Sequence, residues 1–176
     1  MRSFAAAFIL IALAACTEVA PDGEPEAAPA ALYTGGYKPA SDNAHTLTGG
    51  VSVQPGGLMF DGGAVLYTRT LEPRAGADAI APSGDTYAAI ALGPAEMEIE
   101  LRRVIDMSQT TPLRACGAAR PTYVALAYSE RATRLAVLIF SGDEPPGPHA
   151  SDSALCGVFA YAALSGARTR QGIVPW

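Results

Sequence analysis

Hydrophobic and polar residues alternate with a period of two along much of this chain. The clearest run is Ala95–Ile105, where apolar residues alternate with glutamates and then arginines. Since successive side chains of a strand point to opposite faces, this run predicts a strand with one buried and one solvated face. Glu96, Glu98 and Glu100 share a face, so we expect a solvated row of acids there and no paired-carboxylate or Ca²⁺ site.

Other segments are also rich in β-forming or alternating residues and are bounded by Gly, Pro and Asp turn signals. The run Leu135–Phe140 is continuously apolar, which predicts a central strand covered on both faces. The remaining expected strands are Thr46–Val53 (interrupted at Gly49-Gly50), Ala64–Leu71, Thr86–Leu92, Tyr123–Ser129 and Cys156–Leu164.

This spacing of strands predicts one all-β domain. About seven or eight short strands joined by hairpin turns favour a single small antiparallel β-barrel or sandwich. Two segments lack the pattern: Asp106–Ala119 is expected to hold a short helix or an irregular loop, and Gly142–Ser153 is expected to be a long connection.

The N-terminus has the layout of a signal peptide. A positive start at Arg2 is followed by twelve residues without charge, Phe4–Ala15. A helix needs roughly 20 apolar residues to cross a bilayer, so this stretch is too short to remain as a span. We expect residues 1–15 to be a signal peptide that takes no part in the fold.

The end of that stretch reads Leu13-Ala14-Ala15-Cys16, which resembles the lipobox of bacterial lipoproteins. The resemblance implies that a diacylglyceryl group is attached to Cys16 and that cleavage occurs before it. It therefore implies a membrane-tethered domain that faces the periplasm. Thr17 in place of Asp is typical of outer-membrane lipoproteins in enteric bacteria, so we expect the outer membrane. The alternative is an ordinary signal peptide, in which Cys16 is incidental.

Residues 16–31 are expected to be the lipidated cysteine and a disordered tether. Thr17–Ala31 contains three prolines and four acids but no Lys or Arg. Such a segment cannot bury enough apolar surface to offset the entropy lost on ordering. The folded domain is then residues 32–176.

Cys116 and Cys156 are the two cysteines left once Cys16 is assigned to lipid. Outside the cytoplasm two thiols in one small domain usually pair, so we expect a structural disulfide. The alternative, a redox or metal pair, is less favoured because there is no Cys-x-x-Cys motif and no histidine close to either residue.

Charge and candidate chemistry narrow the function further. From Leu32 onward there are eleven Lys and Arg against thirteen Asp and Glu, with no basic excess that would indicate nucleic acid. The only histidines, His45 and His149, are expected to be exposed in loops, and neither has a second ligand at metal spacing. Ser151, Asp152 and Ser153 lie beside His149 but lack a nucleophile elbow. We expect no catalytic, metal or cofactor site.

The stretch Ser83-Gly84-Asp85-Thr86-Tyr87 is weakly similar to the Ser-Gly-x-x-Tyr loop of membrane-bound lysozyme inhibitors, although a hairpin turn explains the same residues more simply. The rest of that family's pattern is absent. The sequence thus predicts a membrane-tethered, non-enzymatic envelope module that binds an envelope protein or cell-wall component or serves a structural role. The alternatives are a lysozyme-inhibitor-like protein and a lipocalin-like carrier of a small ligand. A cavity above about 300 Å³ would favour the carrier.

Overall fold

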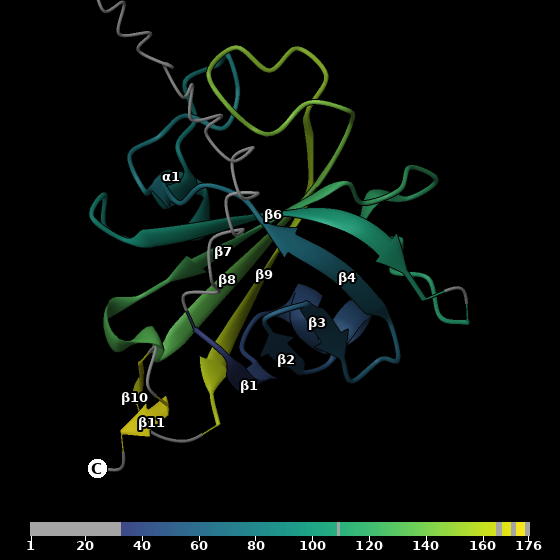
Figure 1. Cartoon of the computed structure of the whole chain (residues 1–176), viewed down its shortest axis with the longest axis vertical. Coiled ribbons are helices and arrows are strands. Elements are labelled where there is room, and N and C mark those ends of the chain that lie inside the picture. Colours follow the sequence, from purple (N-terminus) through teal and green to yellow (C-terminus); the bar gives the residue numbers. More distant parts are fainter. Residues whose placement is uncertain (1–32, 109, 165–166, 170–171, 175–176) are drawn as a thin grey trace, which may run out of the picture.

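The computed structural model of the protein describes residues 33–108, 110–164, 167–169 and 172–174 (Figure 1). The expected signal peptide (residues 1–15) and the expected lipidated cysteine and tether (residues 16–31) lie outside the described residues. Within them, eight antiparallel strands form a closed barrel in the order β4-β3-β2-β1-β9-β8-β7-β6. The barrel strands are β1 (Gly35–Pro39), β2 (Val51–Gln54), β3 (Gly57–Phe60), β4 (Val65–Thr70), β6 (Glu98–Met107), β7 (Tyr123–Tyr128), β8 (Arg134–Ser141) and β9 (Ala154–Ala163).

The pairing of β4 with β6 closes the barrel and confirms the expected all-β class. The register shifts between Tyr67 and Thr68, a bulge that bends the sheet where it closes. A short strand, β5 (Arg74–Ala75), pairs with the start of β6. β10 (Ala167–Thr169) and β11 (Gly172–Val174) form a separate pair.

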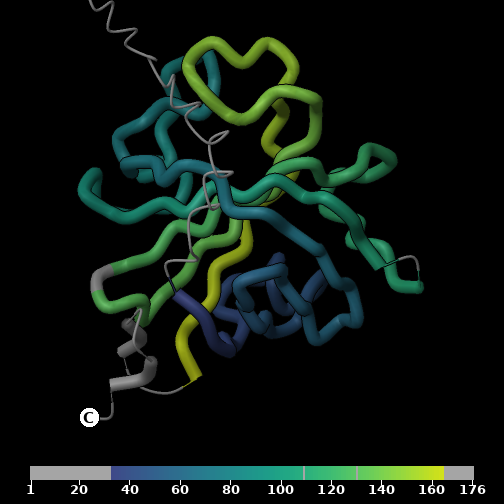
Figure 2. Tube along the Cα trace, in the orientation of Figure 1, coloured from purple at the N-terminus to yellow at the C-terminus, as the bar shows by residue number. Residues whose placement is uncertain are grey.

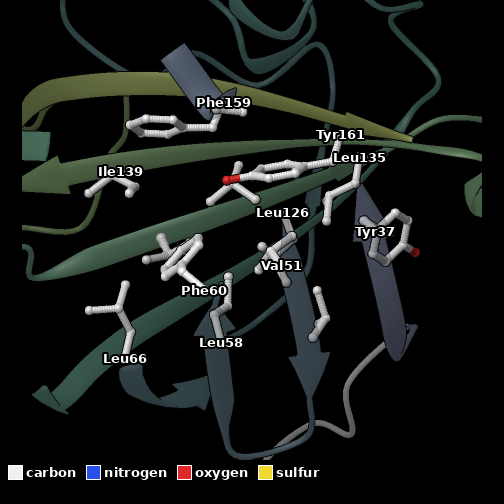
Figure 3. Packing of buried hydrophobic residues seen from close by; sticks show 14 of the residues in the cluster. Tyr37, Val51, Leu58, Phe60, Leu66, Leu126, Leu135, Ile139, Phe159 and Tyr161 are labelled. Atoms are coloured by element: carbon white, nitrogen blue, oxygen red, sulfur yellow. The ribbon is translucent and has the colours of Figure 1, made fainter. Parts of the chain in front are cut away.

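Apolar side chains from all around the barrel fill its interior. Leu58, Leu66, Leu126, Val137 and Phe159 are each 1% exposed or less. Figure 3 shows how side chains from β3, β4, β7 and β9 point toward one another there. A small barrel filled in this way needs no ligand to complete its core.

A second apolar cluster lies outside the barrel, on the outer face of β6, β7 and β8. The segment between β5 and β6, which includes the helix α1 (Tyr87–Ala91), covers this face (Figure 2). Its buried residues include Ile80, Tyr87, Leu101 and Leu138. β8 is therefore buried on both faces, as its continuous apolar sequence predicts.

The disulfide joins Cys116 to Cys156, as expected, with 4.6 Å between their Cα atoms. Cys116 ends the short 3₁₀ helix η2 (Arg114–Cys116), and Cys156 lies in β9. The bond thus fixes the irregular segment 108–122 to a barrel strand. The long connection expected at Gly142–Ser153 is a loop in the structure.

One expected strand is wrong, because Thr86–Leu92 contains the helix α1. The Thr86 hydroxyl oxygen accepts a hydrogen bond from the Ala89 amide (3.2 Å) and caps the helix. A capping threonine followed by alanines outweighs the weak β propensity of the run. The helix ends at Leu92, which has a left-handed backbone (φ 54°).

The expected strand Thr46–Val53 is also only partly correct. Its first half belongs to a helical turn, η1 (Ala44–Thr48), and only Val51–Gln54 forms a strand. The Thr48 hydroxyl donates to the Ala44 carbonyl oxygen (3.1 Å), a local bond that competes with extended structure. The sequence does not predict β1 or β3, because β1 consists largely of glycines and a proline and β3 is only four residues long between glycine-rich turns.

Candidate functional site

The first candidate site is a buried ion pair inside the barrel, between Glu100 and Arg102 of β6. Their side chains are 1% and 0% exposed. The expectation that Glu100 lies in water is therefore wrong, whereas Glu96 and Glu98 are exposed as expected. Glu100, Arg102 and Val104 of β6 face the barrel interior, and Glu100 is tolerated there because Arg102 neutralises it.

Further polar groups surround the pair. Arg102 donates through Nη1 to the Gln54 carbonyl oxygen (2.6 Å), and the Thr70 hydroxyl donates to Glu100 Oε1 (3.0 Å). Among the described residues, Arg102 Nη2 has no hydrogen-bond partner. These bonds connect β6 to β4 and to the end of β2. The cluster therefore has a structural role.

Two aromatic rings lie at the edge of this cluster. Burial, followed by the nearby charge of Glu100, raises the pKa of Tyr128 well above its usual value. Tyr33 packs on Tyr128 with 4.8 Å between ring centroids and donates to Glu98 Oε2 (2.6 Å). Tyr128 is 2% exposed, so the ring pair separates the buried charges from solvent.

The second candidate is a groove on the outer surface of the barrel, with a volume of about 470 Å³. Its floor is a row of alanines on adjacent strands. Ala127 of β7 is paired with Ala136 of β8, and Ala136 is paired with Ala160 of β9. Ala40, just after β1, extends the row by donating its amide hydrogen to the Ala160 carbonyl oxygen (2.8 Å). Four small side chains side by side leave the space that forms the groove, which we call the alanine groove.

One wall of the alanine groove is the chain that leaves α1. Leu92, Gly93, Pro94 and Met97 line it. Leu92 is 93% exposed and adds apolar surface at this wall. A second cavity of about 400 Å³ adjoins the groove, because Pro94, Met97 and Ser129 line both. Tyr33 and Tyr128 lie on its far side.

Positive charge lies along the opposite side of the alanine groove. Arg134 of β8 lines the groove and is paired with Ala162 of β9, which is in turn paired with Lys38 of β1. Both cations are exposed. Among the described side chains neither forms an ion pair. The groove therefore combines an apolar floor with one lining cation, Arg134, and a second cation, Lys38, lies two strands further along the same row.

The residues singled out as possible chemistry in the sequence do not lie at this groove. His45 and His149 are exposed, as expected, although His45 lies in the helical turn η1 and not in a loop. Ser151 donates from its backbone amide to Glu144 Oε2 (2.6 Å), and so does Asp152 (3.0 Å). These bonds from Asp152 and Ser151 hold the pKa of Glu144 below its usual value. Ser151 and Asp152 therefore close the loop between β8 and β9 through their bonds to Glu144.

The stretch Ser83–Tyr87 forms a turn that leads into α1, as the hairpin interpretation predicts. Ala79 and Thr86 are bridged in antiparallel fashion, and Gly84 has a positive φ of 87°. Tyr87 is fully buried, and its burial raises its pKa to about 12. A buried tyrosine cannot enter a partner's cleft, so this geometry gives no support to the lysozyme-inhibitor interpretation.

Sequence reasoning missed both sites. The alanines of the groove repeat at i, i+2 within β7 and β9, a signal that is visible in the sequence. Their alignment, however, depends on the register of three strands. No family model matches this sequence, and no similar protein was found among curated proteins or solved structures.

Within the described part of the chain, no helix is both long and apolar enough to cross a bilayer. The same residues contain no cluster of three His, Cys, Asp or Glu side chains suited to a metal ion.

Proposed function

We propose that this protein is a membrane-tethered, non-enzymatic binding module of the bacterial cell envelope, and that the alanine groove is its binding site. The observation that carries this proposal is the row of four alanines beneath a cavity of about 470 Å³. Ligand sites commonly have volumes of 300–1,000 Å³ and mostly apolar walls. The groove has both properties.

The position of the groove distinguishes this proposal from a lipocalin-like carrier. A lipocalin-like site lies within the barrel, whereas here apolar side chains and the Glu100–Arg102 pair occupy the interior. The groove lies outside the barrel between α1 and the β8–β9 sheet surface. The ligand of this module therefore binds against the barrel wall.

Two features support the envelope location. The Cys116–Cys156 disulfide suits an oxidising compartment. The lipobox ending at Cys16 supplies a lipid anchor, and two or more acyl chains give stable attachment. The membrane is thus one partner, and nucleic acid is not.

Filling the alanine groove tests its role in binding. We choose Ala160→Phe, because Ala160 is partly exposed on the floor and a larger side chain can grow into open space. The matched control is Ala154→Phe, an exposed position on the same strand outside the groove. The probe is N-phenylnaphthylamine, an uncharged apolar fluorophore.

We expect the unmodified groove to bind the probe with increased fluorescence, Ala160→Phe to lose this binding and Ala154→Phe to retain it. Circular dichroism and the thermal midpoint show whether each variant is folded. If Ala160→Phe disturbs the sheet, Ala40→Phe, at the exposed end of the row, replaces it. Equal binding by the folded groove-filling and control variants would exclude the groove as the site.

A further inference from the structure

We propose that the alanine groove binds a long-chain fatty acid, with the alkyl chain on the alanine row and the carboxylate at Arg134 and Lys38. This inference rests on the proposed function, since it names the ligand of the same groove. Two observations support it. The lining of the groove offers few hydrogen-bonding groups, and Arg134 and Lys38 place positive charge in one row of the sheet.

The lining of the groove offers few hydrogen-bonding groups. The floor alanines lie in strands whose backbone groups already pair with neighbouring strands. The amides of Leu92 and Gly93 donate to the Ala89 and Ala88 carbonyl oxygens, and Pro94 has no amide hydrogen. The described polar side chains of the lining are those of Ser129, Arg134 and Tyr161.

This distribution disfavours an extended peptide and favours an alkyl chain. A peptide that entered the groove would leave amide groups without partners, at a cost of about 1–3 kcal/mol for each. An alkyl chain needs only apolar contact. Both edges of β8 and β9 are paired, so a peptide cannot gain bonds there by adding a strand.

The length of the floor also suits a chain. Four adjacent strand positions, from Ala127 to Ala40, span about 14 Å at the usual spacing of strands. The adjoining cavity of about 400 Å³ continues the apolar surface past Met97. A chain of medium or greater length can lie along this path.

The charges of the groove select an anionic end group. Arg134 is the charged side chain among the described residues that line it, and Lys38 lies two strands away in the same row. Two acids, Glu96 and Glu98, and one cation, Arg131, line the adjoining cavity, so the charged side chains there are mainly acidic. A carboxylate is therefore favoured at the Arg134 side of the floor, where no acid among the described residues lines the groove.

The test compares dodecanoic acid with dodecanol, which share a chain and differ in charge. Calorimetric titration uses the mature chain from residue 16 with Cys16→Ser, which lacks the lipid and keeps every described residue. Exposed charge pairs contribute up to about 1 kcal/mol, so we expect each cation to strengthen acid binding roughly two- to fivefold. Salt should weaken binding of the acid and not of the alcohol.

Arg134→Gln with Lys38→Gln should remove the preference for the acid, measured as the ratio of acid to alcohol affinity within the same variant. Arg103→Gln, an exposed arginine on the outer face of β6, is the matched control and should change neither affinity. Equal affinities for acid and alcohol in the parent protein would overturn the fatty-acid inference while the groove remains a binding site. Failure of both ligands to bind would overturn the proposed function as well.

Discussion

Arg102 donates a 2.8 Å hydrogen bond from Nε to Glu100 Oε1 within the closed barrel. The two residues are separated by one position on β6, so their side chains share the inward face of the strand. Each charge is buried, and each is stabilised mainly by the other. Removing one partner should leave an uncompensated charge in the core.

We therefore expect Arg102→Met to lower the free energy of unfolding by about 3–5 kcal/mol, because Glu100 would remain buried without its cation. The double variant Glu100→Met with Arg102→Met should cost less than the sum of the two single variants. Urea denaturation of the parent protein, the two single variants and the double variant measures these free energies of unfolding. Arg103→Met, at the adjacent exposed position, should change stability little, and additive costs in the double variant would contradict the account.

The disulfide closes a sequence separation of 40 residues. Loop-closure entropy predicts that Cys116→Ser with Cys156→Ser lowers the free energy of unfolding by about 4 kcal/mol. The thermal midpoint of the variant, compared with that of the oxidised parent protein, measures the effect. Equal midpoints for the oxidised and reduced parent would show that the bond does not stabilise the fold.

Three buried tyrosines predict a loss of stability at alkaline pH. Burial raises the pKa of Tyr87 and of Tyr161 to about 12 and raises that of Tyr128 well above its usual value. A raised pKa in the folded state stabilises the fold fully below about pH 10, the unfolded value, and this contribution is lost as pH rises through the folded value. The thermal midpoint should therefore fall steeply above about pH 10.

Replacing one of these hydroxyls should reduce the alkaline effect. Tyr161→Phe removes one ionisable group, so the midpoint of this variant should fall less steeply with pH than that of the parent. Tyr67, which is 48% exposed, supplies the control Tyr67→Phe, which should not change the slope. Identical slopes in parent and Tyr161→Phe would show that Tyr161 does not contribute.

The Glu144 carboxylate organises the loop between β8 and β9. Its pKa lies below 4.5 because the amides of Asp152 and Ser151 bind its charged form. A lowered pKa stabilises the loop above about pH 4.5 and loses this effect as pH falls further. Glu144→Gln should speed hydrogen exchange at Ser151 and Asp152 at neutral pH, as measured by NMR. Unchanged exchange there would contradict the assignment.

The proposed lipid anchor makes a separate prediction. Cys16→Ser should release the protein from washed membranes into the periplasmic fraction, because a serine at this position would receive none of the proposed acyl chains. Mass spectrometry of the parent protein should find Cys16 at the mature N-terminus with its lipid. An unmodified residue 16, or a membrane-bound serine variant, would exclude this form of attachment.

The strands that the sequence predicts best are those with an unbroken pattern. The continuously apolar run Leu135–Phe140 lies within β8. The alternating run Tyr123–Ser129 coincides closely with β7. In each run the pattern allows only one interpretation of the secondary structure. Thr86–Leu92 is too short for a period to distinguish helix from strand, and the capping bond of Thr86 decides the outcome.

The sites could not be predicted for a different reason. Glu100 and Arg102 look like surface residues because only their mutual pairing, in three dimensions, makes burial tolerable. The alanine groove depends on the pairing of Ala127 with Ala136 and of Ala136 with Ala160. A shift of one residue in any strand would turn an alanine to the other face. Register is a property of the closed barrel and not of any one segment.

The most direct test of the central claim locates a bound ligand by NMR of alanine methyl groups. With dodecanoic acid added, the account predicts that the methyl signals of Ala127, Ala136 and Ala160 shift together with ligand concentration, while that of Ala154, outside the groove, stays in place. Shifts confined to the barrel interior, at Val124 and Val137 in a valine-labelled sample, or no shifts at all, would contradict it.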